Sequence, residues 1–232
     1  MSNDRRIQQV FSYLKLTEIK GEKKNMDEIM HIAIPQNLEN MQLPSPELLM
    51  YYKNLENRVI WLDTEVDPMW LDYERQIIEW NREDMGVPVE KRKPIKLMFF
   101  SYGGHLDVNY SFIDLIQRSK TPIWGVNMGQ ACSAACFIFI ACHKRFAMPR
   151  SSFLIHQGGV DGGFSGTYEQ VVAAIMEYQR QMDELGKYLI EYTKVTQEML
   201  DEKFASEWYL TANDAVELGV ADKIVDDIDE IM

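Results

Sequence analysis

One serine stands out because it lies among small apolar residues, where a predicted strand is followed by a helix. Ser133 belongs to the segment Gly129-Gln-Ala-Cys-Ser-Ala-Ala-Cys-Phe-Ile-Phe-Ile-Ala-Cys142. In the first turn of a helix, free N–H groups and the positive end of the dipole favour a developing oxyanion. With a base in reach Ser133 would be an activated nucleophile, and without one a helix cap or a core hydroxyl. The segment does not match the Gly-x-Ser-x-Gly pattern of α/β-hydrolases.

Four histidines could supply that base. His156 ends a predicted strand and precedes a glycine-rich loop, and such strand ends commonly present functional groups. His105 follows a Gly-Gly pair at the end of another strand and is the second candidate. His143 lies in a charged turn and His31 in the N-terminal region, where neither is expected to act on Ser133.

The Gly-Gly pair is Gly103-Gly104, directly after a strongly apolar segment. Glycines at a strand end permit positive φ and a close approach of two backbones. An oxyanion donor needs such freedom, and so does a sheet edge that pairs with an extended peptide. The same pair could also form a simple tight turn.

The cysteines offer a competing chemistry. Cys132, Cys136 and Cys142 all lie in the segment around Ser133, without acidic or histidine ligands at metal-binding spacing. They are interpreted as small buried hydrophobic residues. No metal and no cofactor is predicted.

Composition limits the function classes. The chain has 232 residues, of which 46% are apolar and 26% charged, enough for one substantial domain. The formal net charge of −12 argues against nucleic acid as a partner, because phosphates would be repelled. The longest apolar run is too short for a membrane span. A cytoplasmic protein with reduced thiols is expected.

The elements that would position these groups alternate between strands and helices. Strands are predicted at 58–62, 95–100, 122–127 and 153–156, and helices at 68–81, 108–119 and 129–142. This alternation predicts an α/β fold with parallel strand pairing.

A long helix is predicted from 167 to 193. Its apolar positions alternate spacings of four and three residues: Val171, Ile175, Tyr178, Met182, Leu185, Leu189 and Tyr192. A helix of this length spans about 40 Å, more than a compact domain needs. We expect it to project and to pack against another subunit, although a core helix across a sheet would have the same pattern. Residues 1–50 are interpreted as an N-terminal extension that docks on a main domain at 51–232, or that is partly disordered.

Several segments occur in the same order as in the proteolytic subunit of the Clp protease, and residues 51–228 resemble this ClpP family. They are Ser101-Tyr-Gly-Gly104, Gly129-Gln-Ala-Cys-Ser-Ala134, Arg145-Phe-Ala-Met-Pro149, Phe153-Leu-Ile-His-Gln157 and Leu210-Thr-Ala-Asn-Asp-Ala-Val-Glu-Leu-Gly219. The resemblance implies a ClpP/crotonase-like spiral of ββα units with a long projecting handle helix.

The resemblance also implies a site and partners. Ser133 would be the nucleophile and His156 the general base, with oxyanion donors near Gly104 and Ala134 and the substrate paired beside Gly103. The enzyme would be an ATP-independent serine endopeptidase that hydrolyses unfolded polypeptides. Two heptameric rings would stack as a tetradecamer fed by an AAA+ unfoldase of the ClpX, ClpA or ClpC type. Its location would be the cytoplasm or an organelle stroma.

One position departs from the family pattern. An ungapped alignment places Lys203 where the family has the aspartate that orients the histidine. Asp201 is expected to supply this carboxylate after a small shift of the alignment, and Glu202 is the alternative. Two alternatives stay open: a catalytically weak or inactive ring subunit of a mixed Clp complex, and a crotonase-type acyl-CoA enzyme.

Overall fold

A computed structural model describes residues 45–159 and 163–232 of the chain, and residues 46–232 form a compact unit. Most of the predicted N-terminal extension lies outside the described residues. Helix α2 begins at Pro46, so it spans the boundary near residue 50, which stays a prediction.

The unit contains seven strands and seven α-helices within the described ranges. The strands are β1 (Val59–Leu62), β2 (Ile95–Ser101), β3 (Ile123–Cys132), β4 (Lys144–Ala147), β5 (Ser152–Ile155), β6 (Trp208–Thr211) and β7 (Lys223–Ile224). The helices are α2 (Pro46–Glu56), α3 (Trp70–Glu83), α4 (Leu106–Arg118), α5 (Ala134–Ala141), α6 (Tyr168–Tyr192), α7 (Gln197–Lys203) and α8 (Ala212–Glu217).

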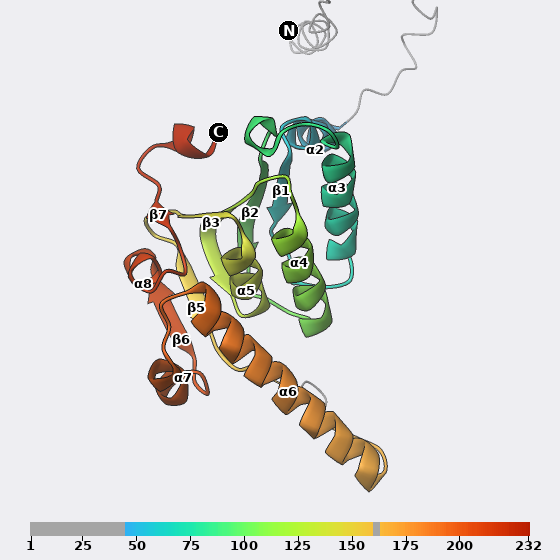
Figure 1. Cartoon of the computed structure of the whole chain (residues 1–232), viewed down its shortest axis with the longest axis vertical. Coiled ribbons are helices and arrows are strands. Elements are labelled where there is room, and N and C mark those ends of the chain that lie inside the picture. The colour runs from blue at the N-terminus through green and yellow to red at the C-terminus, as the bar shows by residue number, and fades with distance from the viewer. Residues whose placement is uncertain (1–44, 160–162) are drawn as a thin grey trace, which may run out of the picture. The chain divides into compact units, whose positions relative to one another are not determined.

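The strands form one sheet in which β1, β2, β3, β4 and β7 are parallel neighbours in that order (Figure 1). The long strand β3 pairs with β4 along its first half and with β5 along its second half. Strand β6 then pairs with β5 in the antiparallel direction. The α/β fold with parallel pairing is confirmed, and β6 is the antiparallel exception.

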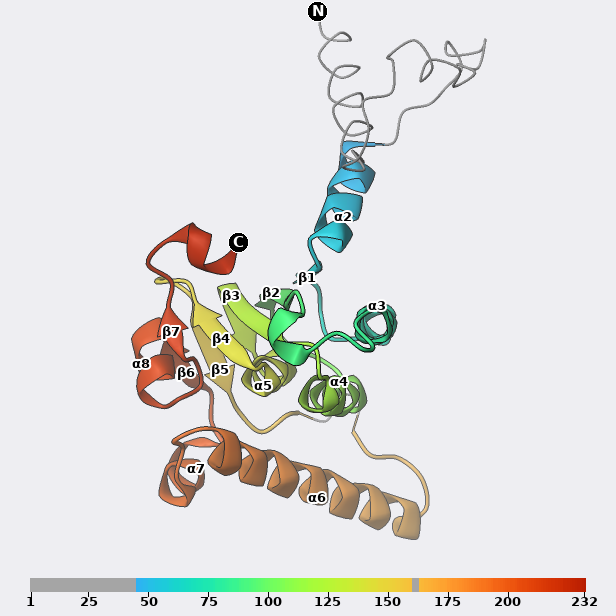
Figure 2. The ribbon, with the colours of Figure 1, turned by 45° about the horizontal axis from the view of Figure 1, so that its top comes forward.

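Helices α3, α4 and α5 cover one face of this sheet (Figure 2). All eight residues of α5 are buried, because this helix lies between the sheet and its helical neighbours. On the other face, the C-terminal segment packs Val225 and Ile231 against Met98 and Val126. The central strands β2 and β3 are therefore largely buried on both faces, which suits their runs of consecutive apolar residues.

The predicted helix at 129–142 begins later than expected. Residues 129–132 continue strand β3, and α5 starts only at Ala134. A continuous apolar run does not distinguish a buried strand from a buried helix, so pattern alone could not place this boundary. The consequence is that Ser133 lies at the junction itself rather than inside the helix.

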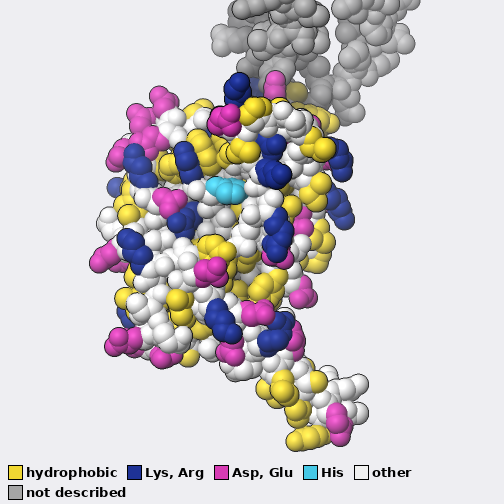
Figure 3. Space-filling view, in the orientation of Figure 1, with side chains coloured by type: hydrophobic (Ala, Val, Ile, Leu, Met, Phe, Trp, Pro, Cys, Tyr) yellow, Lys and Arg dark blue, Asp and Glu magenta, His cyan; other side chains and the backbone are white. Residues whose placement is uncertain are grey.

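The long helix is confirmed as α6, with a capping box formed by Thr167 and Gln170. Its C-terminal half packs on the body through Met182, Leu185 and Leu189. Its N-terminal half extends past the body, and apolar side chains are visible at this end (Figure 3). Exposed apolar residues of this half are Tyr168, Ile175 and Met176. Of the heptad positions in this half, Ile175 is exposed, whereas Tyr178 packs against the core and donates a hydrogen bond to the Gly158 carbonyl.

A largely buried ion pair joins the segments that precede β1 and follow α3, and Thr121 before β3 adds to it. Arg58, before β1, donates two hydrogen bonds of 2.7 and 2.9 Å to the carboxylate of Asp84, after α3. Thr121, which precedes β3, donates a further hydrogen bond of 2.8 Å to the same carboxylate. Hydrogen bonding from the Arg58 guanidinium is the main cause that holds the pKa of the Asp84 carboxyl below its usual value.

We expect Asp84→Asn to lower the free energy of unfolding by about 2–3 kcal/mol at neutral pH, because it leaves the largely buried Arg58 with only the exposed Glu83 carboxylate as counter-charge. A lowered folded-state pKa means that Asp84 stabilises the fold above its ordinary pKa of about 3.9 and loses this effect as the pH falls further. Urea unfolding at pH 7 and near pH 3 should therefore show a smaller difference between variant and wild type in acid. Glu83→Gln, which alters the exposed partner of Arg58, is the control and should change little.

Candidate active site

The parallel pairing of β3 and β5 brings Ser133 and His156 together. Cys132, the last residue of β3, is the register partner of Leu154, the last but one of β5. Carboxyl ends of parallel strands lie at the same edge of a sheet, so the residues that follow them are neighbours. The Nε2 atom of His156 lies 2.8 Å from the Oγ atom of Ser133.

Ser133 has an unusual backbone conformation. Its φ is 52° and its ψ is −126°, a region that residues other than glycine rarely occupy. The Ser133 N–H donates to the carbonyl of Leu154 at 2.8 Å, and its carbonyl accepts from the N–H of Cys136 at 2.9 Å. Strand pairing on one side and the buried helix α5 on the other therefore hold the serine at a sharp strand-to-helix turn.

The backbone at Gly103 packs directly against this turn. A Cβ atom on Gly103 would lie 2.7 Å from both the Ser133 Cβ and the Cys132 carbonyl oxygen, and 3.0 Å from the Ala134 nitrogen. Gly103 also has a φ of +100°, and the next residue, Gly104, has a φ of +150°. Both positions therefore need glycine, because their φ angles are positive and Gly103 lies too close to Ser133 for a side chain. The pair forms more than a simple tight turn.

Backbone N–H groups without an acceptor flank the packed turns of Gly103 and Ser133. The N–H of Gly103 donates to the Oγ of Ser101 at 3.2 Å. Within residues 45–159 and 163–232, the N–H groups of Gly104 and Ala134 have no acceptor. Ala134 is the first residue of α5, where free N–H groups are normal. Two donors therefore stay available close to Ser133.

A carboxylate lies on the other side of the histidine ring. The Nδ1 atom of His156 is 2.9 Å from the Oε1 atom of Glu207. An ionised carboxylate only accepts hydrogen bonds, so the Nδ1 atom carries the proton and Nε2 is left to accept from the Ser133 hydroxyl. The three side chains form a hydrogen-bonded series in the order required for nucleophilic catalysis.

Glu207 reaches this position through the antiparallel strand. It directly precedes β6, in which Trp208 is the register partner of Ile155 in β5. Extending the same register by one residue places Glu207 opposite His156. Sequence reasoning missed both the strand and the glutamate. An acidic residue just before the alternating segment Trp208–Thr211 was the available signal.

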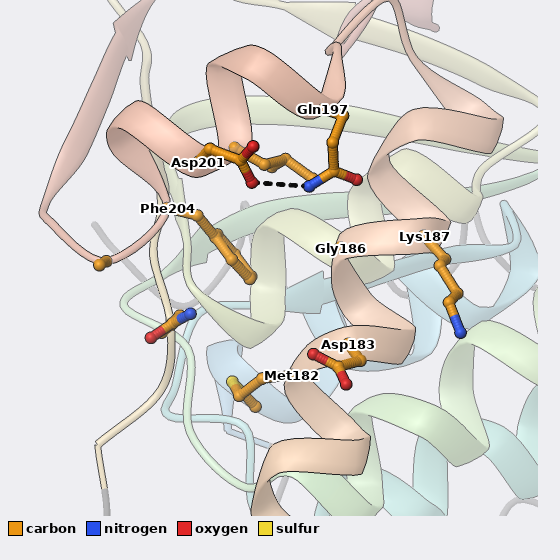
Figure 4. A pocket seen from close by; sticks show the side chains of 10 residues that line it. Met182, Asp183, Gly186, Lys187, Gln197, Asp201 and Phe204 are labelled. Atoms are coloured by element: carbon orange, nitrogen blue, oxygen red, sulfur yellow. Dashed lines mark hydrogen bonds between the residues drawn. The ribbon is translucent and has the colours of Figure 1, made fainter.

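Asp201 does not contact His156. Its Oδ1 accepts a hydrogen bond of 2.8 Å from Gln197 one turn earlier in α7, as Figure 4 shows. Asp201 lines a cavity of about 300 Å³ between α6 and α7, together with Met182, Gly186 and Phe204. Glu202 is exposed on the same helix. The expectation of Asp201 or Glu202 at the histidine differs from the structure, because both precede the turn that leads into β6.

The other histidines lie away from the serine. His105 is exposed and its ring has no hydrogen bond in the described part of the chain. The Nδ1 of His143 accepts from the backbone N–H of Ile123 at 2.9 Å. His31 is outside the described residues. His156 is thus the histidine that the described structure brings to Ser133.

The cysteines are unpaired and buried. Burial is the main cause that raises the pKa of the Cys132 thiol, with the Glu207 carboxylate adding to the effect. Because the thiolate is the reactive form, Cys132 is a poor competitor of the neighbouring serine.

Residues 45–159 and 163–232 contain no group of three histidine, cysteine or carboxylate side chains that could hold a metal ion. The helices in these ranges are too short or too polar to span a bilayer.

Comparison with known proteins gives consistent matches. A model of the Clp protease family matches residues 49–227. The ATP-dependent Clp protease proteolytic subunit 2 of Treponema denticola is 31% identical over 134 residues, 57% of this chain and 66% of the relative. The subunit of the same name from Treponema pallidum is 27% identical over 186 residues, 78% of this chain and 89% of the relative.

A solved structure supports the fold. A ClpP1 mutant from Listeria monocytogenes superposes with a TM-score of 0.66 at 20% identity, covering 79% of this chain and 99% of the other. The predicted ClpP/crotonase-like fold is confirmed. With the family match over most of its length, the chain belongs to the Clp protease family.

Proposed function

We propose that this protein is a serine endopeptidase whose catalytic residues are Ser133, His156 and Glu207. The observation that carries the proposal is the pair of hydrogen bonds that join His156 to the other two side chains, 2.8 Å to Ser133 and 2.9 Å to Glu207. This site departs from the one expected from sequence only in its carboxylate.

The proposed reaction proceeds through an acyl-enzyme. The Oγ of Ser133 attacks the peptide carbonyl carbon while its proton passes to Nε2 of His156. The N–H groups of Gly104 and Ala134 stabilise the oxyanion of the tetrahedral intermediate. The C–N bond breaks as the leaving amine takes the proton from His156, and a water molecule activated by the same nitrogen then hydrolyses the ester. Glu207 stabilises the transient imidazolium.

The family match supports a proposal for the substrate and the assembly. Unfolded polypeptide would pair in extended form beside Gly103 and Gly104. Two heptameric rings would stack as a tetradecamer, with the exposed N-terminal half of α6 packed between them. An AAA+ unfoldase would deliver the substrate. The exposed apolar residues Ile175 and Met176 support the role of α6, because monomeric proteins seldom leave such residues together in water.

Active-site labelling tests the proposal. A fluorophosphonate probe reacts with an activated serine hydroxyl, so we expect the assembled wild type to be labelled and Ser133→Ala to remain unlabelled. Cleavage of an unfolded polypeptide should be lost in the same variant. An intact ring assembly without labelling would instead identify an inactive structural subunit. The crotonase alternative is not favoured by the family match.

A further inference from the structure

The carboxylate at His156 depends on a short connection between α7 and β6. After α7 ends at Lys203, the Ser206 N–H and Oγ both donate to the Lys203 carbonyl, at 3.0 and 2.9 Å. The Gln157 N–H, next to His156, donates to the Phe204 carbonyl at 2.8 Å. This turn therefore ties the end of α7 to the segment that carries the histidine, and Glu207 is the next residue along.

Lys203 makes a second contact across the same turn. Its Nζ atom lies 5.3 Å from the centre of the Trp208 ring, within the range of a cation–π interaction. Trp208 is itself fixed, since it is only 8% exposed and pairs with Ile155 in β5. Lys203 and Trp208 thus hold the turn from both ends, with Glu207 between them.

Glu207 needs such support. Its side chain is 56% exposed, and its only hydrogen bond among the described residues is the one to His156. An exposed glutamate has several rotatable bonds and gains little from a single surface contact. The backbone position that presents it must therefore be well fixed for the carboxylate to stay at Nδ1.

We infer that Lys203 is a positioning residue, whose ammonium group on the Trp208 ring closes the turn and keeps Glu207 against His156. The inference rests on the proposed function, since it assigns a role within that site. It also gives a physical role to the lysine that stands where the family resemblance expects the orienting aspartate. The carboxylate comes instead from the start of β6, and the residue at the end of α7 supports it.

Two substitutions of Lys203 separate charge from packing. Lys203→Met keeps an unbranched chain over the ring without the charge, and Lys203→Arg keeps the charge and the stacking. Lys187→Met is the matched control, because Lys187 is an exposed lysine on α6 that forms no cation–π contact among the described residues. Trp208→Phe is an independent variant at the other partner, since a phenyl ring attracts a cation less strongly than an indole.

The first readout is the Nδ1 proton of His156. A proton held between imidazole and carboxylate gives a far-downfield NMR signal, assigned in ¹⁵N-histidine-labelled protein by its loss in His156→Asn. We expect Lys203→Met to weaken or remove this signal, Trp208→Phe to weaken it less, and Lys203→Arg and Lys187→Met to retain it. A merely structural role for Lys203 would lower thermal stability and leave the signal of the folded protein unchanged.

The second readout is peptide hydrolysis. We expect Lys203→Met to lower kcat about three- to fivefold with little change in KM, in keeping with one cation–π contact. An unchanged signal and rate in Lys203→Met would overturn the inference, as would equal losses in Met and Arg. Failure of the wild type to react with the fluorophosphonate would count against the proposed function but not against the role of Lys203. The NMR signal of the His156 Nδ1 proton would still show whether Glu207 lies at the histidine.

Discussion

Replacing Glu207 by glutamine is expected to lower kcat/KM for peptide hydrolysis by about 10³-fold, within a range of two to four orders of magnitude. The glutamine side chain has a similar size but can donate from its amide to Nδ1. That contact favours the imidazole tautomer with its proton on Nε2, which cannot accept the proton of Ser133. The amide also lacks the negative charge that stabilises the imidazolium formed in the reaction.

The control variants lie on the neighbouring helix. Asp201→Asn and Glu202→Gln each remove one negative charge close to Glu207 in sequence, but Asp201 bonds to Gln197 and Glu202 is exposed. We expect both to retain activity within about twofold, as is usual for surface substitutions. Steady-state kinetics with a fluorogenic peptide would measure all three. A large loss in Asp201→Asn beside a small loss in Glu207→Gln would reject Glu207 as the orienting carboxylate.

The contrast between these carboxylates shows what the sequence could predict. Ser133 and His156 follow segments with strong apolar patterns, and parallel strands place such following residues at one edge. Their meeting was therefore predictable from local patterns and the order of elements. The same applies to the long helix, whose repeat and capping residues are all local.

Glu207 was not predictable in this way. Its place opposite His156 depends on the register between β5 and β6, two strands separated by the whole of α6 and α7. A register is set by long-range packing and by turn geometry, and four-residue strands have little pattern of their own. Counting back without gaps from the segment that starts at Leu210 gave Lys203, and the carboxylates then considered were those of Asp201 and Glu202.

The boundary between β3 and α5 was missed for another reason. Alanine favours helices, and the segment after Gly129 contains several. Pairing with β2 on one side and β5 on the other outweighs that preference as far as Cys132. The positive φ of Ser133 follows from this late and abrupt change of direction, and no residue propensity would have predicted it.

Replacing Gly103 by alanine is expected to lower kcat/KM at least a hundredfold, for a reason that lies in the backbone. The new methyl group would collide at 2.7 Å with the Cβ of Ser133 and with the carbonyl of Cys132. Neither of these atoms belongs to a flexible side-chain end, so the serine turn or the Gly-Gly turn must move. Either movement displaces Ser133 from His156 or the backbone donors from the oxyanion, and loss of one such donor alone costs about 10²–10³ in kcat.

A control variant at Gly86 distinguishes the effect of this collision from the effect of a positive φ alone. Gly86 has a φ of +85°, close to the +100° of Gly103, but an added Cβ there would meet no atom within 4 Å. Gly86→Ala therefore carries the cost of placing an L-residue at positive φ without touching the site, and should lose stability while keeping kcat/KM.

Circular dichroism and ring assembly would establish that both variants fold, and the rate of fluorophosphonate labelling would report on Ser133 directly. Slow labelling in folded Gly103→Ala with normal labelling in Gly86→Ala would show that the close packing of two backbones, and not glycine flexibility in general, holds the nucleophile in place. Equal labelling of the two variants would contradict that role for Gly103.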